Sequence, residues 1–191
     1  MTDKAEWTLS EAARLLEEPQ HRLIYLCEKG VIIPDLGDAQ GRGSSRRFSA
    51  RNLLEFSVAL RLRKLMIPVA PVAVIIRVLR AFEKAIARDM PSFTLPQGLM
   101  DSRSPDLSII ITDDQRLYFG IRMGDKTPKF YGGIDFGTLF LSKQGKLSKQ
   151  GKQVSLEHGK PYLGKVEYKA GESGRTVLSV TRVAQDLDLR K

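Results

Sequence analysis

Two clusters of polar and basic side chains lie near the start of the sequence. The first is Gln20-His21-Arg22, directly after Pro19, and the second is residues 38–49, which read DAQGRGSSRRFS. Arginine, glutamine and serine side chains donate hydrogen bonds to phosphate oxygens and read the edges of nucleic-acid bases. The two clusters therefore predict binding to a nucleic acid, provided that the fold presents both of them on the surface.

The second cluster combines chain flexibility with positive charge. Gly41 and Gly43 permit tight turns of the backbone. The side chains expected to contact phosphates or the minor groove of a duplex are Arg42, Ser44, Ser45, Arg46 and Arg47. The alternative is a solvated surface loop that binds nothing.

Two short helices are expected to position the first cluster. Thr8 and Glu11 form the T-x-x-E pattern of a capping box, which predicts a helix that starts after Thr8. Pro19 suits a first helical position and predicts a second helix, which Gly30 would end in a left-handed conformation. Residues 20–22 would then occupy the exposed first turn of the second helix, which reads the major groove in a helix-turn-helix. Helix spacing alone is also compatible with a helical hairpin in an ordinary all-α core.

These elements resemble the N-terminal domain of the MerR family of transcription regulators. The similarity rests on SEAARLL (residues 10–16), LIYLCEKGVIIP (residues 23–34), SRRFSARNL (residues 45–53) and an apolar helix after Pro68, and it extends over roughly residues 7–85. The resemblance implies a winged helix-turn-helix whose wing is the loop over residues 38–49. It also implies a homodimer that binds double-stranded DNA and distorts promoters, with a roughly palindromic operator.

The sequence departs from the family within the second helix. The family usually carries Leu-Arg-Tyr-Tyr where this chain has Leu23-Ile24-Tyr25-Leu26, so Ile24 replaces an arginine that commonly contacts phosphate. His21, Arg22 and Tyr25 are expected to take over part of that contact. The predicted DNA-binding site comprises Arg14, Gln20, His21, Arg22, Tyr25, Arg42, Ser44, Ser45, Arg46 and Arg47.

Composition limits the other possibilities. The 191-residue chain has a formal net charge of +9, which predicts salt-dependent binding to phosphates. Its one cysteine, Cys27, excludes an internal disulfide and a zinc finger, and neither a metal nor a cofactor is expected. His21 and His158 fall in different predicted elements and no nucleophile, phosphate-loop or metalloprotease motif occurs, so we expect no catalytic residues and no enzyme. No apolar run approaches the length of a membrane span and no secretory signal is found, so we expect a cytoplasmic protein.

The middle of the sequence is predicted to be helical. Ser49 would cap a helix over residues 50–65, and Pro71 would start another that extends to about residue 90. The apolar positions of that second helix recur with helical spacing, at Val72, Ile75, Ile76, Leu79, Phe82 and Ile86, and Val74 and Val78 widen the stripe. So wide a stripe predicts an additional packing partner. That partner would be a second copy of the chain, because MerR-like proteins pair through a helix at this position, or the C-terminal half of the same chain.

The remaining sequence predicts strands. Residues 91–105 contain three prolines and are predicted to be a linker. Alternating apolar residues predict strands at 107–112 and 117–123, and further strands are predicted at 129–131, 134–141, 154–157, 162–168 and 176–183, with Gly132-Gly133 as a turn. The predicted fold class is α+β, with a DNA-binding domain over residues 1–90 and an antiparallel β domain over residues 106–191. The β domain would sense a small-molecule or protein effector.

One local repeat stands apart. The hexapeptide LSKQGK occurs twice in succession over residues 141–152 and carries four lysines and no acidic residue. It predicts either a duplicated surface loop without a role or a second arm that contacts phosphates.

Three functions are compatible with these patterns. The first is a homodimeric transcription regulator that binds double-stranded DNA and senses an effector. The second is an excisionase-like architectural adaptor that binds DNA and recruits a protein. The third is a protein-interaction module that does not bind DNA. Salt-dependent duplex binding would separate the third from the others.

Overall fold

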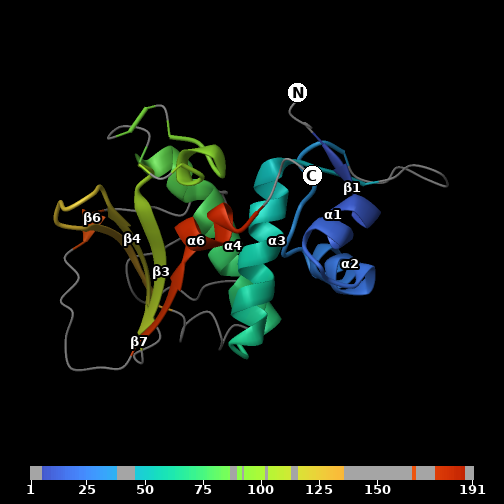
Figure 1. Cartoon of the computed structure of the whole chain (residues 1–191). Coiled ribbons are helices and arrows are strands. Elements are labelled where there is room, and N and C mark those ends of the chain that lie inside the picture. The colour runs from blue at the N-terminus through green and yellow to red at the C-terminus, as the bar shows by residue number, and fades with distance from the viewer. Residues whose placement is uncertain are drawn as a thin grey trace.

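The computed structural model describes residues 6–37, 46–86, 90–91, 93–101, 103–112, 116–135, 165–166 and 175–187. The elements in chain order are β1 (Trp7–Thr8), α1 (Leu9–Leu15), α2 (Gln20–Glu28), β2 (Arg47–Phe48), α3 (Ala50–Lys64), α4 (Val69–Ile86), η1 (Gln97–Leu99), β3 (Asp106–Thr112), β4 (Arg116–Arg122), β5 (Lys129–Asp135), β6 (Lys165–Val166), β7 (Arg175–Ser179) and α6 (Val180–Gln185). This mixture of helices and antiparallel strands confirms the predicted α+β class. Figure 1 shows α3 standing between the α1–α2 pair and the five-stranded sheet.

The first two helices begin and end as their capping residues dictate. The Glu11 carboxylate accepts a hydrogen bond from the Thr8 N–H (2.8 Å), and the Thr8 hydroxyl accepts one from the Glu11 N–H (3.3 Å), which completes the predicted capping box. Pro19 is the N-cap residue of α2, so that helix begins one residue later than predicted, at Gln20. Gly30 follows α2 with a φ of 64°, which confirms the predicted left-handed end.

The two central helices follow the same local rules. The Ser49 hydroxyl accepts a hydrogen bond from the Asn52 N–H (3.2 Å) and caps α3 as predicted. The next helix, α4, begins at Val69 rather than at Pro71. Proline is tolerated there because a first-turn residue has no N–H bonded within the helix.

The C-terminal sheet is antiparallel, with strand order β6-β5-β4-β3-β7. The predicted turn at Gly132-Gly133 is wrong, because β5 is one strand and accommodates an extra residue through a register shift opposite Leu117/Tyr118. The predicted strand over residues 176–183 is also wrong in its second half. Ser179 ends β7 and caps α6 by accepting a hydrogen bond from the Arg182 N–H (3.2 Å). The LSKQGK repeat and the strand predicted at residues 154–157 lie outside the described residues.

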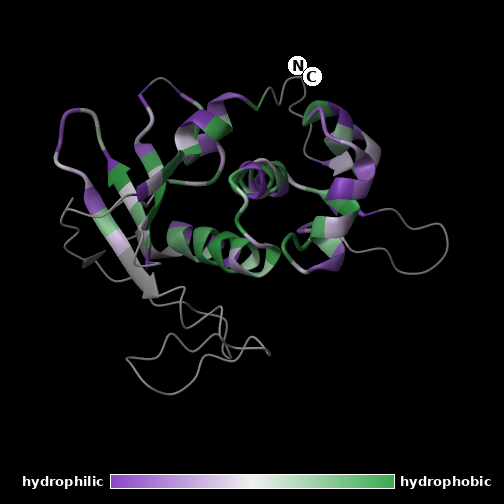
Figure 2. Cartoon of the chain, turned by 90° about the horizontal axis from the view of Figure 1, so that it is seen from below, coloured by the Kyte–Doolittle hydropathy of each residue, from purple (hydrophilic) through white to green (hydrophobic). Residues whose placement is uncertain are grey.

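Among the residues that the structure describes, one hydrophobic core extends from the helices into the sheet. Phe82 of α4 is fully buried and stacks on Phe119 of β4, with ring centroids 5.3 Å apart, while Tyr131 of β5 meets it edge-on at 5.4 Å. The C-terminal half of the same chain therefore covers the Phe82 part of the wide stripe on α4. Figure 2 views α3 along its axis, between the α1–α2 pair and the sheet.

The segment predicted as a linker also belongs to this core. Its side chains Phe93, Leu95 and Leu99 are buried, at 5%, 4% and 0% exposure. The turns around η1 bring these residues inward, so these three side chains belong to the same core as the helices and the sheet.

Candidate nucleic-acid interface

Helix α2 has one buried face and one exposed polar face. Leu23 and Leu26 are buried, at 0% and 2% exposure, and hold the helix on the core. Gln20, His21 and Arg22 occupy the first turn and are all exposed. The helix therefore presents to solvent the three side chains that the sequence predicts to contact DNA.

Glu18 holds Arg22 in place at the start of α2. Its carboxylate, only 8% exposed, accepts a hydrogen bond from the Arg22 guanidinium at 2.8 Å and pairs with the Lys64 ammonium at 3.0 Å. Burial by itself raises the pKa of Glu18, but hydrogen bonds and charges from Lys64 and Arg22 outweigh it and hold the pKa below its ordinary value of 4.5. Glu18 thus joins the first turn of α2 to the C-terminal end of α3.

Replacing Glu18 by glutamine is expected to lower the free energy of unfolding by about 0.5–1 kcal/mol at pH 7, because both partners are largely exposed and the ion pairs are screened. The pKa of Glu18 is lowered in the folded state, so this stability is present above pH 4.5 and is lost as the pH falls through the folded-state pKa. Urea titrations at pH 7 and pH 3 would check this. Glu28→Gln, at an exposed position on α2, is the control. A difference between E18Q and the natural protein that persists at pH 3 would contradict the electrostatic origin.

Tyr25 lies one turn further along α2 and is 42% exposed. The Lys29 ammonium lies 5.6 Å from the centre of its ring, within the distance of a cation–π contact. Lys29 was absent from the predicted site, although its spacing of four residues from Tyr25 on a helix was a usable signal.

The base of the arginine-rich loop is held by the β1–β2 pair. β2 pairs with β1, with Thr8 opposite Arg47 and Trp7 opposite Phe48. The Arg47 N–H donates to the Gly37 carbonyl at 3.2 Å, which closes the loop between these two residues. Because β1 leads directly into α1, the loop begins and ends beside the two helices.

The predicted loop residues divide into two groups. Arg46 and Arg47 are half-buried, and the Arg47 guanidinium lies 3.5 Å from the Glu6 carboxylate. Arg42, Ser44 and Ser45 lie outside the described residues.

A buried polar network anchors the backbone between α2 and the loop. The Asn52 amide oxygen accepts from the Asp35 N–H (2.9 Å), and its amide nitrogen donates to the Ile33 carbonyl (3.0 Å) and the Glu55 carboxylate (3.1 Å). Arg80 of α4 donates to the same Ile33 carbonyl (2.7 Å). The exit of α2 is therefore tied to both α3 and α4.

Glu55 and Arg80 form the charged centre of this network. Two guanidinium nitrogens donate to the two carboxylate oxygens, and a third lies 3.3 Å from Asp35. Burial raises the pKa of Glu55, while the hydrogen bonds and charge of Arg80 oppose that increase. Asn52, Glu55 and Arg80 were not among the residues predicted from the sequence to form the site. The sequence did contain a signal for this network, because these polar residues interrupt runs of apolar residues in two predicted helices.

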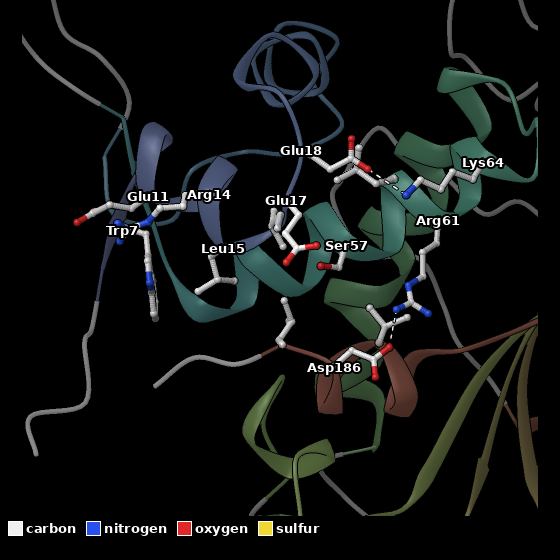
Figure 3. A pocket seen from close by; sticks show the side chains of 14 residues that line it. Trp7, Glu11, Arg14, Leu15, Glu17, Glu18, Ser57, Arg61, Lys64 and Asp186 are labelled. Carbon is white, nitrogen blue, oxygen red and sulfur yellow. Dashed lines mark hydrogen bonds and ion pairs between the residues drawn. The ribbon is translucent and has the colours of Figure 1, made fainter. Parts of the chain in front are cut away.

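Arg14 is placed apart from the exposed turn of α2. It is exposed on α1 and lines a cleft of about 650 Å³ between α1, α3 and α6 (Figure 3). The structure therefore assembles residues 20–22 and Tyr25 on one helix, while Arg14 faces a separate hollow.

Comparison with known proteins adds no assignment: no family model matches the chain, and no curated protein matches it. Within the described part of the chain, no three metal-ligating side chains gather into a group that could hold a metal ion. Among the helices that the structure describes, none has the length and apolar character needed to cross a membrane.

Proposed function

We propose that the protein binds double-stranded DNA through a winged helix-turn-helix and regulates transcription. The observation that carries this proposal is the arrangement of α2, whose apolar face is buried while Gln20, His21 and Arg22 project from its exposed first turn. In a helix-turn-helix these early positions of the second helix reach base edges in the major groove.

The arginine-rich loop supports the same assignment. Its base is closed by the hydrogen bond between Arg47 and Gly37, and the β1–β2 pair holds Arg47 opposite Thr8 at the start of α1. A wing that leaves the fold there would extend from beside the helix pair. Its arginines would contact phosphate oxygens, and the chain's net charge of +9 favours such contacts. The Tyr25–Lys29 pair would extend this phosphate-binding surface along α2.

Replacing Arg22 by alanine is expected to weaken duplex binding about 5- to 150-fold, the equivalent of roughly 1–3 kcal/mol, because a base-reading contact would be lost. Duplexes selected by the natural protein from a randomised pool would be titrated by fluorescence anisotropy at two salt concentrations. Affinity is expected to fall steeply as salt is raised.

The matched control for Arg22 is Arg122→Ala. Arg122 is an exposed arginine on β4, paired with Asp106 at 3.4 Å on the opposite side of α3 from α2. The Arg122→Ala substitution should leave duplex affinity unchanged. Equal effects of the two substitutions would reduce the interaction to general charge attraction, and failure to enrich any duplex would argue against sequence-specific binding.

Dimerisation is part of this proposal, and it must use a surface other than the buried Phe82 face of α4. Two copies would place two α2 helices on successive half-sites, one helical turn of DNA apart. Sedimentation of the protein with and without a selected duplex would reveal whether two copies bind.

A further inference from the structure

The cleft beside Arg14 lies between parts of the chain that are far apart in sequence. Its walls come from α1 and the turn that follows it, from α3 and from the C-terminal α6 segment (Figure 3). A volume of about 650 Å³ falls within the range of roughly 300–1,000 Å³ typical of small-molecule sites. The cleft is therefore large enough to hold a compact organic ligand.

Most charged groups in the cleft already have partners. Lys64 pairs with Glu18 at 3.0 Å, and Arg61 pairs with Asp186 across α3 and α6 at 2.5 Å. The exposed Glu17 carboxylate and the exposed Arg14 guanidinium, in contrast, form no hydrogen bond or ion pair with any of the residues that the structure describes. Four carboxylates and three cationic groups line the cleft, and Arg22 from outside it also pairs with Glu18, so these groups together are neutral.

Glu17 is held in this position by its backbone. It has a φ of 53° at the left-handed end of α1, where its N–H donates to the Arg14 carbonyl (3.2 Å) and the Glu18 N–H donates to the Ala13 carbonyl (3.0 Å). Figure 3 shows its carboxylate directed toward Ser57, whose hydroxyl has no hydrogen-bond partner among the described residues. An unpaired carboxylate and a hydroxyl acceptor therefore face the same part of the cleft.

The cleft also offers apolar surface around these acceptors. Leu16 comes from the α1 end, Leu60 from α3, and Val183 from α6. Trp7 lines the cleft near Arg14 and Glu11 (Figure 3). An ammonium group bound by Glu17 and Ser57 would leave an attached hydrocarbon or ring against these side chains.

We propose that this cleft binds a small organic ammonium compound with an apolar body, held by the Glu17 carboxylate and the Ser57 hydroxyl. A ligand there would contact α6 and Glu17. The neighbouring residue, Glu18, accepts a hydrogen bond from Arg22 of the proposed DNA-reading turn. Such a site goes beyond DNA binding. The test measures binding of a small molecule in the absence of DNA. Its outcome is therefore independent of whether the protein binds DNA.

The experiment uses the full chain and three probes of similar size but different charge: 2-phenylethylamine, 2-phenylethanol and 3-phenylpropionate. Binding would be measured by isothermal titration calorimetry and by the shift in Tm. The ammonium compound is expected to bind and raise the Tm, with the neutral alcohol at least tenfold weaker and the anion without effect. A tenfold loss corresponds to about 1.4 kcal/mol, a reasonable value for one charge-assisted contact.

Two substitutions locate the site. Glu17→Gln is expected to weaken binding of 2-phenylethylamine about tenfold, whereas Glu28→Gln, at an exposed position on α2 that does not line the cleft, should leave it unchanged. Preferred binding of 3-phenylpropionate would overturn the proposal and assign the cleft to anions through Arg14. Equal binding of all three probes, no binding of the amine, or an unchanged affinity in E17Q would overturn it as well.

Discussion

The Arg80→Met variant is expected to lose about 3–5 kcal/mol of unfolding free energy, because it leaves the Glu55 carboxylate buried without its counter-ion. Glu55 is 1% exposed and accepts two hydrogen bonds from Arg80. The variant also removes a donor from the Ile33 carbonyl and a cation beside Asp35. Urea unfolding followed by circular dichroism would measure the loss.

The pH dependence of this variant identifies the cause. Burial raises the folded-state pKa of Glu55 above its ordinary value of 4.5, and loss of Arg80 would raise that pKa further. For a carboxyl group with a raised folded-state pKa, stability is greatest below pH 4.5 and falls as the pH rises through the folded-state pKa. The difference between R80M and the natural protein should therefore be smaller at pH 5 than at pH 8.

Two further variants serve as controls for Arg80→Met. Arg77→Met replaces an exposed arginine on the same helix and should change stability by less than about 0.5 kcal/mol. The double variant R80M/E55L removes both charges and should be more stable than the sum of the single losses predicts. If R80M lost no more unfolding free energy than R77M, the network of Asn52, Glu55 and Arg80 would not anchor the fold. We also expect R80M to weaken duplex binding, since the exit of α2 would lose a tether.

The Phe82→Ala variant is expected to lose about 3–5 kcal/mol of unfolding free energy, the usual result of removing a fully buried aromatic ring. Phe82 is the aromatic link between α4 and the sheet, through Phe119 and Tyr131. Its truncation would open a cavity where the two halves of the chain meet. Phe82→Leu retains most of the volume and should cost considerably less.

Protein concentration distinguishes the two explanations of the stripe on α4. If Phe82 packs within its own chain, the difference in urea midpoint between the natural protein and F82A should be the same at every protein concentration, and F82A should keep the oligomeric state of the natural protein. The contrary result would be that F82A loses less than about 1 kcal/mol of unfolding free energy while a dimer of the natural protein dissociates. That result would assign Phe82 to a contact between chains.

Much of the helical half could be predicted because its signals are local. The capping box of Thr8 and Glu11, the left-handed Gly30 and the Ser49 cap involve residues no more than four positions from the helices that they begin or end. The wrong predictions in the sheet also came from reading local patterns. Gly132-Gly133 suggested a turn, but pairing with β4 keeps the strand continuous, and residues 180–183 suggested a strand but form α6 under the Ser179 cap.

By itself, the sequence determined the α+β class, the boundaries of the first helices to within a residue or two, and the polar character of the first turn of α2. Helix caps and apolar periodicity depend on neighbours along the chain, and these can be read directly from the sequence. Tertiary structure alone decided that Arg80 reaches Glu55, that Lys64 reaches Glu18, and that Phe82 of α4 packs against the sheet of its own chain. Those contacts join residues 25, 46 and 37 positions apart, and their formation depends on how whole elements pack together, which no local pattern encodes.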